Sequence, residues 1–301
     1  MATSQRSRRR SDSSRSRGPR YIEPVLDPTW ENPYTPSAAE REGHLGATKK
    51  FLMGQQRGLL VGGAALTVLL LVAGILVSPV IGILAAVVVA GLTAWLVQRN
   101  VRAGDAKGAV LGDAMLAAFK PGGSPVERKR LITVLDRLAA TFGVDGISAF
   151  IVADDGYNAA LVPNGSTMAL FVTSAVMQDF ELIELEGVVA HLLARHRLGV
   201  IGRTAASASL TLSDAKRREL AGPGVAYRAD EVAAAGIRYP LGLAGALRKC
   251  ARQVVAPTSF FATPTYNEWR YTFFDFFSDR RENDLGDLDD VELRALALEE
   301  W

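Results

Sequence analysis

The sequence predicts an α+β fold: a mostly helical domain with a small β-meander, anchored by a two-helix transmembrane hairpin. Three observations lead to this fold class. Residues 58–97 contain no charged side chain, short β-like runs follow between residues 147 and 173, and helix-like patterns fill most of the chain from there to residue 277. With 301 residues, of which 49% are hydrophobic, the chain is long enough for one membrane segment and one domain with its own core.

The uncharged run is about twice as long as one membrane span requires. At 1.5 Å per residue, roughly 40 residues would form about 60 Å of helix, whereas the hydrocarbon core of a bilayer is ~30 Å thick. Proline has no N–H group and restricts the residue before it, so Ser78-Pro79 in the middle of the run favours a break. We therefore predict two spans, 58–77 and 80–98, within a hairpin segment of residues 48–107. The alternative is a long hairpin buried inside a soluble protein.

Basic residues flank the hairpin on both sides. They are Lys49, Lys50 and Arg57 before the first span, and Arg99, Arg102 and Lys107 after the second. Because segments rich in Lys and Arg stay on the cytoplasmic side, this pattern predicts a protein integral to the plasma (inner) membrane of a bacterium, with both termini and the globular domain in the cytoplasm. Cys250 is the only cysteine, so an intrachain disulfide is excluded, as expected in a reducing compartment.

The two ends of the chain carry opposite charge. Residues 1–20 hold seven arginines and one acid, whereas residues 279–301 hold nine acids and three arginines. We expect residues 1–47 to form a disordered Arg/Ser-rich arm, because they offer little apolar material for a core. We favour contact of this arm with anionic lipid headgroups over nucleic-acid binding or phosphorylation-controlled docking. Its aromatic part, 21–34, resembles a short partner-binding motif, and residues 279–301 are predicted to be a solvated acidic helix or tail.

Residues 108–278 are predicted to be the globular domain. Ser124-Pro125-Val126-Glu127 has the form of a capping box with proline at the first helical position, and the helix that it starts ends near Gly143. Short β-like runs follow, and Asn164-Gly165 offers a tight turn between the second and the third of them. The predicted strands are 147–152, 158–162 and 169–173, and the predicted later helices are 181–198, 226–236, 240–255 and 266–277.

The most informative stretch is Glu186-Gly-Val-Val-Ala-His191-Leu-Leu-Ala-Arg195-His196. In a zinc-binding His-Glu-x-x-His helix, two histidines stand four residues apart, and the glutamate beside the first is the general base. Here Leu192 stands at the glutamate position and Arg195 at the position of the second histidine. His196 lies five residues after His191, which turns the helix by about 500° and separates the two side chains by roughly 140°. Both imidazoles therefore cannot reach one metal ion from a regular helix.

Several sequence blocks around this helix occur in a characteristic order. They are Asn158-Ala-Ala-Leu-Val-Pro163, Phe171-Val-Thr-Ser174, the stretch from Glu181 to His191, and Tyr227-Arg-Ala-Asp230. Together with the hairpin before them, they resemble the HtpX-like membrane metallopeptidases, relatives of the CaaX prenyl protease, over roughly residues 50–255. The resemblance implies a domain of the zincin, gluzincin-like type.

The resemblance places the zinc site of that family on residues that depart from it. The first zinc histidine falls on His191, and a supporting aspartate falls on Asp230. The second zinc histidine falls on Arg195, the third ligand (a glutamate) on Ala226, and the general base on Leu192. Because catalytic zinc requires three protein ligands and an open position for water, these positions are expected to be vestigial, with no catalytic residue, no metal and no cofactor.

Expectations for the neighbouring charges follow from the same resemblance. Arg195 would bring a permanent positive charge to the place of the metal and would pair with Asp230 or Glu231 from the next helix. His191 is expected to be a partly buried histidine paired with a polar group. The acidic residues at the start of its helix are expected to be solvated; they are Glu181, Glu184 and Glu186.

These features predict a membrane-anchored pseudopeptidase that acts as a scaffold, binding or regulatory subunit at the cytoplasmic membrane face, with the bilayer and other proteins as partners. One alternative is an active metallopeptidase with rearranged ligands, His191, His196 and either Asp230 or Glu231, which would require a π-bulge in the helix. Another is a structural subunit of a membrane assembly that docks through its terminal arms. Small residues in the hairpin permit close packing in a complex or homo-oligomer; they include Gly62, Gly63, Ala64, Gly74, Gly82 and Gly91.

Overall fold

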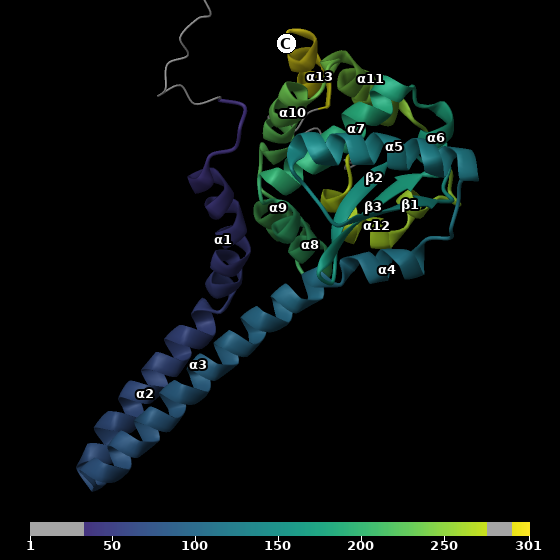
Figure 1. Ribbon diagram of the computed structural model, residues 1–301. Coiled ribbons are helices and arrows are strands. Elements are labelled where there is room, and N and C mark those ends of the chain that lie inside the picture. Colours follow the sequence, from purple (N-terminus) through teal and green to yellow (C-terminus); the bar gives the residue numbers. More distant parts are fainter. Residues whose placement is uncertain (1–32, 276–290) are drawn as a thin grey trace, which may run out of the picture. The chain divides into compact units, whose positions relative to one another are not determined.

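Two apolar helices form a hairpin in the computed structural model, which describes residues 33–275 and 291–301 (Figure 1). Helix α2, Arg57–Val77, and helix α3, Pro79–Ala109, are separated by Ser78 alone, which confirms the predicted break. Gly74 and Gly82 meet across the hairpin so closely that a Cβ on either one would collide with the backbone of the other. Both helices are long and apolar enough to cross a membrane.

Apolar side chains cover the outside of the hairpin. Val61 is 69% exposed and Leu76 is 84% exposed, and many of their leucine, isoleucine and valine neighbours are exposed as well. This exposure does not fit a hairpin buried in a soluble core, where such side chains would be covered by protein. Helix α3 continues beyond residue 98, where the second span was predicted to end, and its last part contacts helix α8, Ile201–Ser209.

The domain that follows the hairpin is mostly helical, as predicted. Its remaining helices are α4 Leu111–Ala118, α5 Pro125–Phe142, α6 Ser174–Asp179, α7 Leu182–Arg197, α9 Asp214–Ala221, α10 Val225–Gly236, α11 Pro240–Arg252 and α13 Val291–Glu299. The capping box of α5 is present, with Glu127 N–H donating to the Ser124 hydroxyl and Ser124 N–H donating to the Glu127 carboxylate, and Gly143 ends the helix at a φ of 62°. The helix predicted over 266–277 is present in part, as α12 Pro264–Trp269 followed directly by the 3-10 helix η2 Arg270–Thr272, and a further 3-10 turn, η1 Phe260–Ala262, precedes it. Residues 273–275 are not helical, and 276–277 lie outside the described residues.

The sheet has three strands, but it is not the predicted meander. The strands are β1 Ile147–Val152, β2 Ala159–Asn164 and β3 Thr167–Thr173, in the order β1-β3-β2. β2 and β3 form an antiparallel hairpin through the predicted turn at Gly165, which has a φ of 63°. β1 instead pairs with β3 in parallel, so the sheet is mixed. Strand order was not predictable from the runs themselves, because β1 and β2 are similar apolar segments with no feature that selects a neighbour.

Both faces of the sheet are covered by helices, with α5 on one side and α4 and α12 on the other (Figure 1). The side chains alternate accordingly. Leu161 and Leu170 belong to the core that includes residues of α5, α7, α10 and α11. Val162 and Phe171, their immediate neighbours in sequence, belong to a second core with residues of α4 and α8. A sheet buried on both faces explains why its strands read as nearly continuous apolar runs.

Part of the segment predicted as a solvated acidic tail is buried. Helix α13 packs against α10 and α11, with Ala295 fully buried, Arg294 1% exposed and Leu298 3% exposed. The prediction of a solvated tail rested on the acidic composition of 279–301 as a whole. It overlooked the apolar residues that stand among these acids at helical spacing and that α13 buries. Residues 279–290 lie outside the described residues.

Helix α1, Ala38–Gln55, also differs from the prediction, because its first half falls within the arm that was expected to be disordered up to residue 47. The Ser37 hydroxyl caps it by accepting a hydrogen bond from Glu40 N–H at 3.1 Å. Thr48 and Leu52 are buried. The first 32 residues, and with them most of the predicted arm and partner-binding motif, lie outside the described residues.

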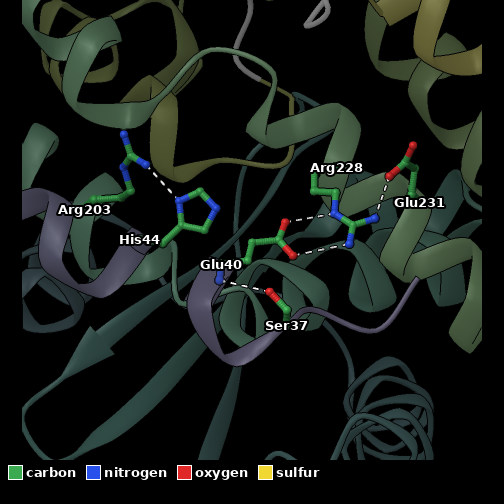
Figure 2. A network of polar contacts seen from close by, with 6 residues as sticks. All are labelled: Ser37, Glu40, His44, Arg203, Arg228 and Glu231. Carbon is green, nitrogen blue, oxygen red and sulfur yellow. Dashed lines mark hydrogen bonds and ion pairs between the residues drawn. The ribbon is translucent and has the colours of Figure 1, made fainter. Parts of the chain in front are cut away.

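Polar contacts fasten α1 to the domain (Figure 2). The Glu40 carboxylate accepts hydrogen bonds from the Arg228 guanidinium of α10 at 2.9 and 3.3 Å, and Arg228 also donates to Glu231 at 2.7 Å. Arg203 of α8 donates to Nδ1 of His44 at 2.9 Å. These partners are far away in sequence and could not be predicted. The start of the helix did have a local signal that was missed, because Ser37-Ala-Ala-Glu40 has the spacing of a capping box.

Candidate functional site

Helix α7 carries His191 and Arg195, and it is almost completely buried. Its residues from Glu184 to Arg195 are all inaccessible to solvent or nearly so. Gly187 allows α11 to lie directly against it, since a Cβ there would collide with the backbone of Leu243. Helix α7 therefore forms the central element of the domain and does not line an open cleft.

The glutamates at the start of α7 differ from the prediction that they are solvated. Glu184 accepts from Lys249 at 2.6 Å and also accepts from the backbone N–H of Glu181 at 2.7 Å. Glu186 forms a salt bridge with Arg137. Both Glu184 and Glu186 are buried, and of the three acids only Glu181 is exposed. Two carboxylates thus connect α7 to α11 and α5.

Three charged or polar side chains meet in the buried centre of the domain. The Nδ1 atom of His191 lies 2.7 Å from Oδ1 of Asp230, which comes from α10. Arg294 of α13 donates from Nε to Oδ2 of Asp230 at 2.6 Å and from Nη2 to Oδ1 at 3.1 Å. All three side chains are at most 4% exposed. This buried triad joins three helices through charge-assisted hydrogen bonds.

The protonation of the triad follows from its burial. Burial lowers the pKa of His191 to about 4; Asp230 opposes this change, and the positive charges of Arg294 and Arg195 add to it. Burial by itself would raise the pKa of Asp230, but Arg294 and His191 outweigh it, so the pKa of this carboxyl lies below its usual value. At neutral pH, His191 is therefore neutral and donates its Nδ1 proton, and Asp230 and Arg294 form the ion pair.

Arg195 was predicted to pair with Asp230 or Glu231, but in the structure it binds different partners. Its guanidinium group instead donates to backbone carbonyl oxygens: to Phe273 at 2.8 Å, to Thr272 at 3.4 Å, and to Tyr271. Three successive carbonyl groups turn toward a cation that is only 3% exposed. The acid that was expected to neutralise Arg195 is already held by Arg294, which sequence reasoning did not identify.

The segment that receives Arg195 is bound to the edge strand β2. Phe273 forms an antiparallel bridge with Ala160, and the N–H of Phe274 donates to the carbonyl of Ala159 at 2.7 Å. The fully buried side chain of Asn158 donates to the carbonyl of Asp275 at 2.7 Å and accepts from its N–H at 3.1 Å. Residues 273–275 therefore lie beside β2, joined to it by one β-bridge and by the side chain of Asn158.

Phe274 also closes the centre beside His191. The two rings meet edge to face, with centroids 5.2 Å apart and an angle of 85° between their planes. Phe274 is fully buried. The Nε2 atom of His191 has no hydrogen-bond partner among the residues that the structure describes. In the family that the sequence resembles, a histidine at this position binds zinc; here its ring lies against Phe274.

Apolar side chains stand at the other two positions that the resemblance assigns to the zinc site, Leu192 and Ala226. Leu192 is fully buried in the main core. Ala226, which is 6% exposed, lines a cavity together with Arg195 and Tyr271. The volume of this cavity is about 20 Å³, enough for a single water molecule and far too small for a peptide. The structure thus brings His191 and Asp230 into contact and places Arg195 and Ala226 on the same small cavity, in a closed interior.

A zinc ion does not fit the residues of this centre. His191 provides one imidazole, and the nearest carboxylate, Asp230, is held on both oxygens by its partners. The guanidinium groups of Arg195 and Arg294 add two permanent positive charges where a dication would have to lie. Across residues 33–275 and 291–301, no group of three or more His, Cys, Asp and Glu side chains is placed to hold a metal ion.

No protein-family model matches the chain, and no curated protein is similar to it. The resemblance to the HtpX-like metallopeptidases therefore rests on the sequence blocks alone.

Proposed function

We propose that this chain is a membrane-anchored, catalytically inactive relative of the HtpX-like metallopeptidases. In this proposal the α2–α3 hairpin crosses the plasma membrane, both termini and the domain lie in the cytoplasm, and the domain serves as a scaffold, binding or regulatory subunit. The apolar, exposed surface of the hairpin supports the membrane anchor, and the basic residues at its two ends support the orientation.

One observation carries the proposal of inactivity. Asp230, at the position of the family's supporting aspartate, is neutralised by Arg294 instead of assisting a metal ligand. Arg294 and the 271–275 segment together fill the space in front of His191 with the protein's own atoms. A peptide bond and the water that would attack it have no access to this centre, because its polar side chains are at most 4% exposed.

The alternative of rearranged zinc ligands has little structural support. It requires a π-bulge that turns His196 toward His191, but α7 is a regular α-helix over its whole length. His196 instead lies near Arg41 of α1, and burial, followed by the charge of this arginine, lowers its pKa.

Proteolysis assays test the proposal of inactivity. Full-length protein in detergent micelles should not cleave casein or an unstructured membrane-protein fragment, whether zinc or a chelator is added. Trace protease contamination is the main source of error, so His191→Gln provides the control. Cleavage that disappears with the chelator and in His191→Gln would support the active alternative.

The proposed scaffold role is tested by co-purification after mild detergent extraction. Deletion of residues 1–32 removes the arm and retains α1 with its contact between Glu40 and Arg228. Partners that remain bound would be held by the domain or the hairpin. Partners that no longer co-purify after the deletion would favour a structural subunit that docks through its arm.

A further inference from the structure

A pocket of about 390 Å³ opens between α1, the start of α2, α8 and α9. Its volume lies within the roughly 300–1,000 Å³ that small-molecule sites occupy in proteins. It is separate from the buried triad, and none of the vestigial zinc-site positions lines it. Its walls are formed by both polar and apolar groups, among them Lys50 and Phe51 of α1 and Leu220 of α9.

The charge of the lining is predominantly positive. Lys50, Arg57 and Arg203 contribute three cationic groups, and Glu219 contributes one carboxylate. A pocket with this excess of positive charge attracts an anion, and arginine forks match the oxygen atoms of a phosphate particularly well.

Arg203 is held in place before any ligand arrives (Figure 2). Its Nε donates to the carbonyl oxygen of Leu220 at 2.7 Å, and its Nη1 donates to His44 at 2.9 Å. Partial burial lowers its pKa from the usual value, although an arginine stays charged at neutral pH. A cation that its own protein keeps in one orientation loses little conformational freedom on binding an anion.

The pocket lies at the boundary between the apolar hairpin and the polar residues that precede it. Arg57 is the first residue of α2, and the residues after it are uncharged as far as Val97. On the other arm of the hairpin, Asn100 donates to Gln56 at 3.1 Å, so the two helices leave the apolar region at the same level. Trp95 is 53% exposed, and Arg99 lies over its ring at 5.3 Å, as expected for an aromatic anchor at a membrane interface.

We propose that this pocket binds the phosphate group of an anionic glycerophospholipid. In the bound state, the phosphate contacts Lys50, Arg57 and Arg203, and Phe51 lies against the glycerol and the first part of the acyl chains. Headgroups lie within the few ångströms just outside the hydrocarbon core, which is the level of Arg57. The inference rests on the membrane anchoring proposed above.

A lipid titration of the full-length protein in a non-ionic detergent tests this site. The melting temperature is measured against increasing short-chain phosphatidylglycerol, with short-chain phosphatidylcholine and inorganic phosphate as separate arms. We expect a saturable increase with phosphatidylglycerol only. With about 1 kcal/mol for each basic side chain, Lys50→Gln combined with Arg57→Gln should weaken the apparent affinity about 30-fold.

Lys49→Gln is the matched control, because it removes the same charge from the neighbouring exposed position of α1, outside the pocket. Its affinity should stay within about two-fold of the unchanged protein, and Lys50→Arg combined with Arg57→Lys should retain most of the binding, because the charges remain. An equal loss in Lys49→Gln would show diffuse charge attraction and overturn the site. An equal response to inorganic phosphate would assign the pocket to a soluble ligand and overturn the lipid.

Failure of this titration is distinguishable from failure of the anchor. If the protein remains soluble and folded without detergent, the membrane proposal fails. If the protein requires detergent but shows no saturable response to phosphatidylglycerol, only the lipid site is overturned.

Discussion

The buried triad and the pocket beside α1 both contain several charged side chains, but these charges are balanced in the triad and mostly positive in the pocket. Asp230, His191 and Arg294 neutralise one another inside the domain and are at most 4% exposed. Lys50, Arg57 and Arg203 stand around an open space with only Glu219 among them to balance their charge. The triad is therefore closed to any ligand, whereas the pocket presents cationic side chains to an open space.

This difference bears on where function should be sought in a domain for which we propose a vestigial enzyme motif. The α7 sequence directs attention to His191, and in the structure this residue belongs to a sealed ionic core. A buried ion pair gives weak evidence for a stabilising role by itself, because desolvation of the charges is costly. Removing one member, however, leaves the other uncompensated, so the triad can be tested by single and double substitutions.

The largest effect is expected for Arg294→Ala. It leaves the Asp230 carboxylate buried without its cation, which should lower the free energy of unfolding by about 3–5 kcal/mol. Denaturant unfolding of the full-length protein in detergent measures this loss. Arg248→Ala is the matched control, because Arg248 also binds α13, through Glu292 and Glu299, but on the exposed surface. Asp230→Asn combined with Arg294→Met should be less destabilised than the two single losses added together.

A smaller loss is expected for Arg195→Ala. The carbonyl oxygens of residues 271–273 lose their donor in a buried place, at a cost of about 2–3 kcal/mol. Hydrogen exchange should locate the effect in this segment and in β2. Arg197→Ala, two residues further along α7 and partly exposed, provides the comparison. If both variants lose the same free energy of unfolding, the hydrogen bonds from Arg195 to the carbonyl oxygens of residues 271–273 have no special part in closing the centre.

Acid should destabilise the triad through His191. The unfolded chain binds a proton at this histidine below its usual pKa of 6.5, whereas the folded chain does so only below about 4. Stability is therefore present above pH 6.5 and falls as the pH drops from 6.5 toward 4, by about 1.4 kcal/mol per pH unit for one proton. His44 and His196 also have lowered pKa values and add to the same trend.

The contribution of His191 is isolated by the pH slope of His191→Gln. This slope should be smaller by roughly one proton between pH 6 and 5. The absolute stability of the variant does not matter to the comparison. An unchanged slope would mean that His191 is protonated in the folded chain, in spite of the positive charges of Arg294 and Arg195.

The smallest effect is expected where α1 meets the domain. Glu40→Gln removes the charge that pairs with Arg228, and both side chains are partly exposed, so α1 should lose about 0.5–1 kcal/mol of local stability. Faster hydrogen exchange or proteolysis limited to residues 38–47 would reveal this loss. Glu42→Gln, at an exposed position on the same helix, should leave the exchange of α1 unchanged.

The sequence predicted those features that depend on local chemistry. The break at Ser78-Pro79, the capping box of Ser124 and Glu127, and the turn at Gly165 each follow from the backbone preferences of a few adjacent residues. For His191, the sequence predicted a polar partner without naming it, and the structure shows that this partner is Asp230.

The rest depends on contacts between distant segments. Arg294 binds Asp230, which lies 64 residues earlier in the sequence. It stands in an acidic stretch, where the sequence does not distinguish it from an arginine that pairs with a neighbouring acid on the surface. The 271–275 segment lies on β2 because of backbone pairing, which its aromatic side chains do not reveal. The one available signal was the apolar spacing of Ala295 and Leu298, which indicated that α13 has a face to bury.

The zinc content of the purified protein tests the central claim most directly. Full-length protein is extracted with a mild detergent, purified without chelator in the presence of excess zinc, dialysed, and measured by elemental analysis beside His191→Gln. A sealed triad predicts far less than one zinc ion per chain, with no difference between the two proteins. One zinc ion per chain that is lost in His191→Gln would contradict the account.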